Sequence, residues 1–185
     1  MSRILGTFCS TDRPMASCIW RGCLLGIIPI VVLEWCVLPQ TVTLIAYFVL
    51  EPRMLPMPWL LAAIIIVPWV EALLMWPVLW VLKEVVQDEL CVASIFAVTW
   101  SVLHALIMAH GFYIGTGVIG GWLIVWTSFV LSLCFLEWQK KSQARAITVT
   151  ALVLTCQFVA VGVETILILM LLPFRFSVYG PYFID

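Results

Sequence analysis

The sequence contains no asparagine, only two histidines and few charged residues. Asp, Glu, Lys and Arg together make up 10% of the 185 residues, and the longest basic run is the pair Lys140–Lys141. A net charge of −1 without a basic cluster gives no electrostatic footprint for nucleic acid, so we exclude that partner. Two histidines and no HExxH motif supply too few ligands for a metal site, and no cofactor is expected.

The seven cysteines follow no spacing that is typical of a metal site or of a redox motif. They are scattered through apolar stretches, and no CxxC pair occurs among them. Because a thiol without such a pattern behaves as a small hydrophobic side chain, we interpret the cysteines as buried packing residues.

Hydrophobic residues are what the sequence has in excess. They make up 64% of the chain, and the mean hydropathy is +1.17. An ordinary soluble domain holds about 45–50% of such residues, so that class is excluded. The sequence predicts an all-α fold, a polytopic transmembrane helix bundle of five spans, or six if residues 41–50 cross separately. The lipid bilayer is the expected surrounding.

Changes in composition divide the chain into four segments. They are a polar N-terminal segment (residues 1–17), a first kinked span with a Pro-rich loop (18–57), a four-helix core (58–172) and a C-terminal tail (173–185). Charged, Pro-rich or Gly-rich breaks separate the apolar runs of the core. The core spans are expected near residues 59–82, 91–109, 112–136 and 146–172.

The distribution of Lys and Arg predicts the orientation in the membrane. In the five-span arrangement, seven basic residues lie on one side and two on the other. The larger group is Arg3, Arg13, Arg21, Lys83, Lys140, Lys141 and Arg145, and the smaller is Arg53 and Arg175. Since the cytoplasmic side holds the excess of basic residues, the N terminus is predicted to be cytoplasmic.

Glu71 lies near the middle of the second predicted span. A central carboxylate costs roughly 2.5–3.5 kcal/mol unless it is protonated, paired or in contact with water. His104 in the third predicted span is the natural partner, and it shares a polar and small face of that span with Ser101. We therefore expect Glu71 and His104 to face each other within the membrane.

The last predicted span carries a polar stripe of its own. Thr150, Gln157 and Glu164 recur every seven residues and fall on nearly one helix face. Since an amide both donates and accepts hydrogen bonds, Gln157 is expected to line the same cavity as Glu71 and His104.

Two motifs resemble those of the CPBP family, the CAAX prenyl proteases and bacteriocin-processing proteins also called Abi. The run Val67-Pro-Trp-Val-Glu71 resembles the family's first motif, and Trp100-Ser-Val-Leu-His104 resembles its second, an aromatic residue ahead of a histidine. The resemblance covers about residues 60–165 and continues in the basic loop 137–145 and the small, apolar helix after it.

The resemblance implies a metal-independent, glutamate-dependent intramembrane endopeptidase that acts on membrane-embedded or prenylated peptides, in a bacterial inner membrane. It implies that Glu71 is the catalytic base and that His104 orients the water or donates to the oxyanion. The expected supporting residues of the substrate cavity are Trp76, Trp100, Ser101, Gln157 and Glu164.

The chain also departs from the family pattern. Ala72 replaces the paired glutamate, Trp76 stands at an arginine position, and Leu154 falls near the third-motif histidine. The third-motif asparagine has no counterpart, and Gln157 is the nearest polar candidate on that span. The chain is therefore predicted to be a degenerate, single-glutamate variant with weak or narrowly specific activity.

Three other interpretations stay open on the sequence. The Glu71–His104 pair can be a structural contact that fixes helix register. The protein can be a catalytically inactive relative that binds membrane segments as a scaffold. It can also be a small transporter subunit that uses Glu71, His104 and Glu164 as a proton path. Against a transporter, the sequence has no internal repeat.

Overall fold

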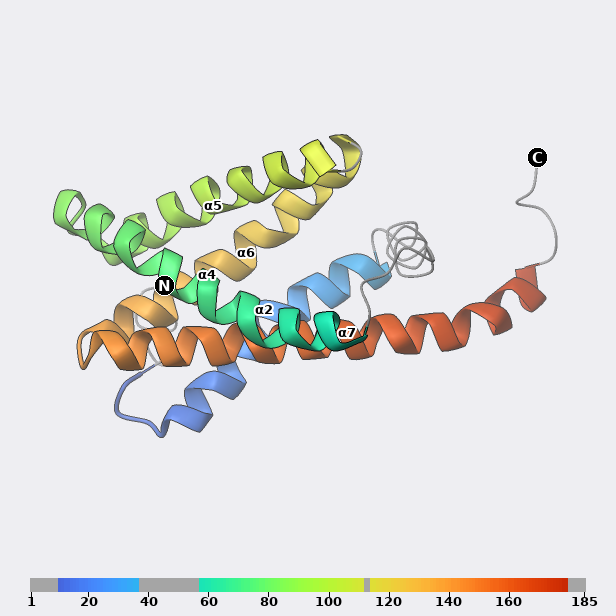
Figure 1. Ribbon diagram of the computed structural model, residues 1–185, viewed down its shortest axis with the longest axis horizontal. Coiled ribbons are helices and arrows are strands. Elements are labelled where there is room, and N and C mark those ends of the chain that lie inside the picture. The colour runs from blue at the N-terminus through green and yellow to red at the C-terminus, as the bar shows by residue number, and fades with distance from the viewer. Residues whose placement is uncertain (1–9, 37–56, 112–113, 180–185) are drawn as a thin grey trace.

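A computed structural model of the protein describes residues 10–36, 57–111 and 114–179, apart from some side chains near the helix ends. These residues form five helices, and no strand occurs among them (Figure 1). The helices are α2 (Met15–Cys36), α4 (Met57–Val85), α5 (Glu89–Gly111), α6 (Ile114–Gln139) and α7 (Gln143–Tyr179). The all-α prediction is confirmed for this part of the chain.

Three helices are long and apolar enough to cross a membrane. The spanning segments are Ile64–Val85, Glu89–Ile107 and Gln143–Ala160, while the apolar stretches Met15–Pro29 and Ile124–Gln139 are shorter. Large apolar side chains such as Ile66, Trp80 and Leu106 are half exposed or more. Outward apolar faces suit contact with lipid tails, so the structure is compatible with an integral membrane protein. The bundle of five spans stays a prediction.

Two helix ends differ from the predicted boundaries. α2 begins at Met15, inside the segment predicted as polar, because the Pro14 carbonyl already accepts the amides of Ser17 and Cys18. α7 continues through Pro173 to Tyr179, into the predicted C-terminal tail. An apolar run shows which part of a helix is hydrophobic, but the helix ends where its backbone hydrogen bonds end. Helix boundaries are therefore predicted less well from hydropathy than the helices themselves. The alternative crossing at residues 41–50 lies outside the described residues.

Consecutive helices from α4 to α7 run in opposite directions along the longest axis of the molecule (Figure 1). This places residues 10–14, the 86–88 turn and the 140–142 turn at one end, which we call the charged end. Two contacts tie these segments together: Lys140 Nζ lies 3.1 Å from Glu89 Oε2, and Lys141 Nζ donates to the Thr11 carbonyl. The loops predicted on one side of the membrane thus lie together.

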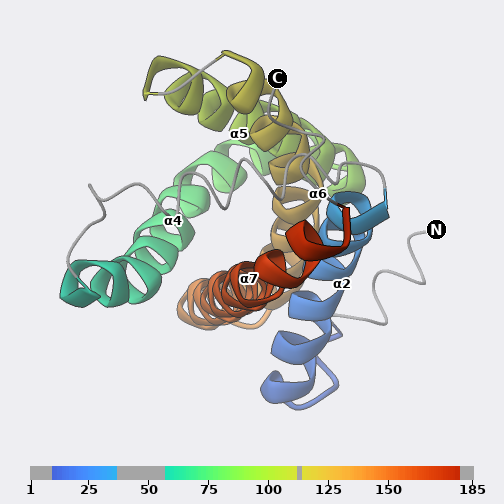
Figure 2. The ribbon, with the colours of Figure 1, turned by 90° about the vertical axis from the view of Figure 1, so that its right-hand side faces the viewer.

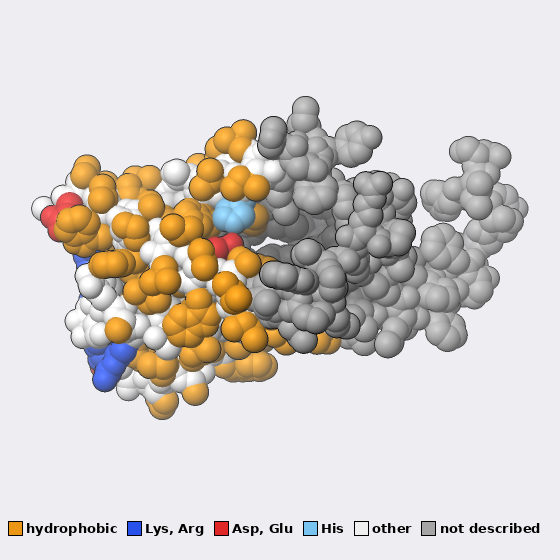
Figure 3. All heavy atoms as spheres, viewed as in Figure 1, with side chains coloured by type: hydrophobic (Ala, Val, Ile, Leu, Met, Phe, Trp, Pro, Cys, Tyr) orange, Lys and Arg blue, Asp and Glu red, His pale blue; other side chains and the backbone are white. Residues whose placement is uncertain are grey.

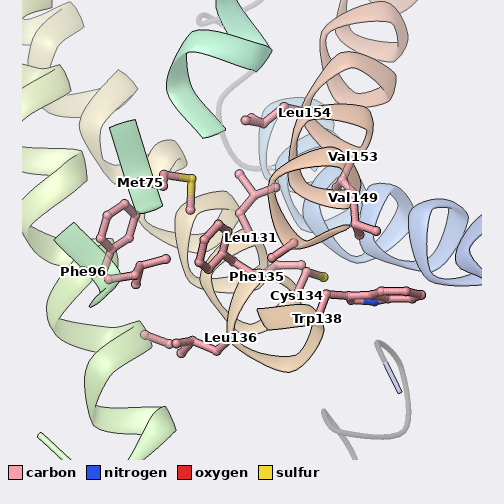
Figure 4. Packing of buried hydrophobic residues seen from close by; sticks show 14 of the residues in the cluster. Met75, Phe96, Leu131, Cys134, Phe135, Leu136, Trp138, Val149, Val153 and Leu154 are labelled. Atoms are coloured by element: carbon pink, nitrogen blue, oxygen red, sulfur yellow. The ribbon is translucent and has the colours of Figure 1, made fainter. Parts of the chain in front are cut away.

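The core lies toward the charged end and is organised around α6. α6 packs against α5, α7 and α2, and α7 also packs against α4 (Figure 2). In Figure 4, Met75 of α4 and Phe96 of α5 lie on one side of Phe135, whereas Val149 and Val153 of α7 lie on the other. All five of these side chains are almost fully buried. This packing fixes where α4 and α5 meet.

Close contact between α2 and α7 depends on two glycines, Gly22 and Gly26, which are four residues apart. A Cβ at Gly22 would lie 3.2 Å from Val153 Cγ2 and 3.3 Å from Cys134 Sγ. Small residues at this spacing let helices approach closely in lipid. The cysteines behave as packing residues only in part: the side chains of Cys18, Cys23 and Cys134 are buried, and those of Cys91 and Cys156 are exposed.

Candidate functional site

The site lies where α4 and α5 leave the core. Ala72, Met75 and Leu79 form the buried stripe of α4, spaced three and four residues apart as one helix face requires. The 86–88 turn reverses the chain, and Asp88 begins α5 by accepting the amides of Leu90 through Oδ1 (3.2 Å) and of Val92 through its carbonyl (2.9 Å). The two helices therefore meet as an antiparallel pair.

Glu71 and His104 are in contact across this pair of helices. Glu71 Oε1 lies 3.5 Å from His104 Nε2, which agrees with the expectation that they face each other. The side chains are 20% and 24% exposed, so each is partly buried and partly open to the surroundings. In Figure 3 a histidine and an acidic side chain lie side by side on a face that is otherwise largely hydrophobic.

One turn of α5 fixes the orientation of the imidazole ring. His104 Nδ1 lies 3.0 Å from the Trp100 carbonyl oxygen, and the two rings are 5.4 Å apart at 51°. The Trp100 ring in turn stacks on Phe96, with centroids 5.2 Å apart. Because a carbonyl oxygen only accepts, Nδ1 must carry a hydrogen. Nε2 is then the ring nitrogen that contacts Glu71.

This orientation allows two hydrogen-bonded forms of the pair. If Glu71 is protonated, its hydroxyl donates to a neutral Nε2; if Glu71 is ionised, a protonated Nε2 donates to it. In both states the Glu71–His104 contact holds one proton. A distance of 3.5 Å exceeds the roughly 2.7–2.9 Å of a tight charged hydrogen bond. The site can therefore give up or take a proton, as general acid–base chemistry or proton transfer requires.

Among the predicted supporting residues, Trp100 is the one with a described contact to the pair. The Ser101 hydroxyl is buried but donates to the Val98 carbonyl of its own helix (2.9 Å). The Trp76 side chain is 37% exposed, and no described hydrogen bond joins it to the pair. Trp100 contributes through its carbonyl and ring, as described above. The side chain of Glu164 lies outside the described part of the chain.

Gln157 lies against α2. Its side chain is 6% exposed, and a Cβ on Gly26 would come within 2.0 Å of Gln157 Nε2. Neither Gln157 Nε2 nor the buried Thr150 hydroxyl has a hydrogen-bond partner among the described residues. No hydrogen bond in that part of the chain links Gln157 to Glu71 or His104, so its role in their cavity stays a prediction.

Sequence reasoning missed the feature that places Gln157. The Gly22-Cys-Leu-Leu-Gly26 spacing in α2 is a small-xxx-small pattern that could have indicated a helix contact. Among the described residues, no group of three or more His, Cys, Asp or Glu side chains could hold a metal ion.

Comparison with known proteins does not assign this site. The chain matches no protein-family model, no curated protein and no solved structure. Membership of the CPBP family is therefore not shown, and the resemblance depends on the sequence patterns described above.

Proposed function

We propose that the protein is a metal-independent intramembrane endopeptidase of the CPBP type, in which Glu71 is the catalytic base. The observation that carries the proposal is the 3.5 Å approach of Glu71 to a histidine whose other ring nitrogen bonds to a backbone carbonyl. A partly open carboxylate beside such a histidine is suited to activate water. His104 then orients the water or donates to the oxyanion.

The reaction would proceed by attack of water on the scissile carbonyl carbon. Glu71 takes one proton from the water as the new carbon–oxygen bond forms, and His104 donates a hydrogen bond to the developing oxyanion. When the carbon–nitrogen bond breaks, the proton passes to the leaving amine. The products are a carboxylic acid and an amine, so the step needs no oxidant or reductant.

The substrates in this proposal are membrane-embedded or prenylated peptides that reach the pair from the lipid phase. The apolar side chains of Val70 and Leu103, next to the pair in sequence, are exposed on α4 and α5 and suit such an approach. We place the protein in a bacterial inner membrane as a five-span bundle, with the charged end and the N terminus in the cytoplasm. The clustering of the 86–88 and 140–142 turns with residues 10–14 supports this orientation.

A binding protein without turnover is the second candidate. One observation favours it: within the described residues, no hydrogen bond brings a second side-chain donor to the pair, so His104 alone would have to bind the oxyanion. Loss of a single oxyanion donor typically lowers the rate by about a hundred- to a thousandfold. We therefore expect slow cleavage at most.

The test uses purified protein in liposomes with a panel of transmembrane and prenylated peptides, analysed by mass spectrometry. Glu71→Gln keeps the shape of the side chain but cannot take a proton, so we expect cleavage to fall at least about a hundredfold. His104→Ala should also lower it. Glu84→Gln is the matched control, since Glu84 is exposed near the end of α4.

The outcomes separate the candidates. Cleavage that is unchanged in Glu71→Gln would show that this carboxylate is not the base. No cleavage by the folded wild type would favour the binding protein. Proton uptake into the liposomes that depends on Glu71, without cleavage, would assign a proton path instead.

A further inference from the structure

Among the described residues, three exposed basic side chains at the charged end form no ion pair. Lys140 is the exception in this region: its Nζ lies 2.7 Å from Glu137 and 3.1 Å from Glu89. The next residue, Lys141, donates to the Thr11 carbonyl and lies 5.8 Å from the centroid of the Trp138 ring. It forms no ion pair within the described chain. The same holds for the exposed side chains of Arg13 and Arg145.

We call Arg13, Lys141 and Arg145 the basic patch. The contact of Lys141 with Thr11 brings the segment that carries Arg13 to the α6–α7 turn, and Arg145 lies in the first turn of α7. That first turn contains no acidic residue. The nearest acid in sequence is the exposed Asp12, which accepts from the Ser10 hydroxyl (3.2 Å). The patch therefore keeps an excess of positive charge.

Apart from Asp12, the described acidic side chains of this end lie at the α4–α5 turn or are paired with Lys140. Glu84 and Asp88 flank the α4–α5 turn, and Glu137 and Glu89 are occupied by Lys140. Figure 3 shows the same separation: basic side chains lie near the start of α7, and acidic ones near the turn between α4 and α5. Because the two signs are apart, the basic patch is open to an external anion.

The patch lies at the depth of lipid headgroups if the apolar helices cross a bilayer. The spanning segments of α4, α5 and α7 end or begin at Val85, Glu89 and Gln143, all at the charged end, and Gln143 lies between Lys141 and Arg145 in the sequence. On α2, the Trp20 side chain is 64% exposed in the second turn, where an aromatic ring suits the interface. At this depth the anionic group next to the patch is the phosphate of a lipid headgroup.

We propose that the basic patch binds the phosphate of an anionic phospholipid headgroup. The Arg13 and Arg145 guanidinium groups can bind phosphate oxygens in pairs, and the Lys141 ammonium adds a point charge. The acyl chains would lie along the exposed apolar faces next to the patch. This site is separate from Glu71 and His104 and does not depend on the proposed peptidase activity.

The experiment measures lipid binding to the full chain in detergent by native mass spectrometry. The probes are phosphatidylglycerol and phosphatidylcholine with identical acyl chains. We expect tighter binding of phosphatidylglycerol, weakened about fivefold by Arg145→Gln, since one basic residue near an anionic surface changes affinity by about that factor. Arg13→Gln should have a similar effect. Lys83→Gln removes the same charge from the other side of this end and should change the ratio less than about twofold.

Arg145→Gln is the primary variant because the Arg145 side chain is exposed and makes no described contact, so the protein should fold. Equal binding of both lipids by the wild type would overturn the proposal. So would equal losses in Arg145→Gln and Lys83→Gln, which would indicate a general charge effect. Inorganic phosphate at constant ionic strength should not displace the lipid; displacement at low concentration would show a site for free phosphate instead.

Discussion

Glu71 and His104 lie level with each other relative to the turn that joins their helices. At 1.5 Å per residue, Glu71 is about 21 Å of helix from the end of α4 at Val85, and His104 is about 22 Å from the start of α5 at Glu89. The antiparallel arrangement then brings the two side chains within 3.5 Å. If the distances are measured instead from the far ends of the predicted spans, at residues 59 and 109, the two residues lie at different depths in the membrane.

This register predicts a measurable coupling between the two side chains. Side-chain hydrogen bonds between membrane helices contribute about 0.6 kcal/mol on average and up to about 1.7 kcal/mol. A double-mutant cycle of Glu71→Gln and His104→Gln, followed by unfolding in mixed micelles, should give a coupling in that range. The cycle of Glu84→Gln with His104→Gln should be additive, because these sites are far apart along the helices. Additivity in both cycles would show that the contact does not stabilise the fold.

A second contact across helices predicts an effect on stability. Pro29 has no N–H group, so the Leu25 carbonyl four residues earlier lacks its helical donor. The Trp126 indole Nε1 of α6 donates to that carbonyl instead, at 2.7 Å. We expect Trp126→Phe to lower the free energy of unfolding by about 0.5–1.5 kcal/mol, and by less in a Pro29→Ala background, where the helical donor is restored.

Trp80→Phe is the control for this prediction. Trp80 is 50% exposed and makes no described hydrogen bond, so its replacement should cost little. An equal effect of Trp126→Phe with and without Pro29 would contradict the hydrogen-bond explanation.

The ion pairs of Lys140 predict how the stability of the fold changes with pH. Partial burial lowers the pKa of Lys140, but its ion pairs with Glu137 and Glu89 outweigh burial and place the pKa above its ordinary value of 10.5. A lysine with a raised pKa stabilises the fold at pH values below 10.5 and loses that effect as the pH rises through its folded pKa. The side chain is 46% exposed, so the contribution is at most about 1 kcal/mol.

The measurement compares the unfolding of Lys140→Met with that of the wild type. The difference in stability should be constant from pH 7 to 10, shrink at higher pH, and also shrink in high salt because exposed pairs are screened. A difference that persists above the folded pKa of Lys140 would mean that the charge of Lys140 is not what stabilises this end.

Periodicity and hydropathy predicted the helical class, the order of the helices and the approach of Glu71 to His104. These features follow from local sequence: apolar runs form helices, and a short charged turn makes neighbours antiparallel. The contacts of Gln157 with Gly26 and of Trp126 with Leu25 could not be predicted in this way. They join residues far apart in the chain, and their partners depend on which face of each helix the core selects.

The last prediction concerns Gly26 and Gln157. A Cβ at Gly26 would lie 2.0 Å from Gln157 Nε2, closer than real atoms approach, and 3.0 Å from its Cδ, so the buried Gln157 side chain would have to shift. We expect Gly26→Ala to lower the free energy of unfolding by about 1–3 kcal/mol, the usual cost of overpacking. In a Gln157→Ala background the clash is gone, and the same change should raise stability by about 0.5–1 kcal/mol, because alanine favours helix over glycine. The reversal of sign, followed by unfolding in mixed micelles, is the test. If Gly26→Ala has the same effect in both backgrounds, the Gln157 amide does not lie against α2.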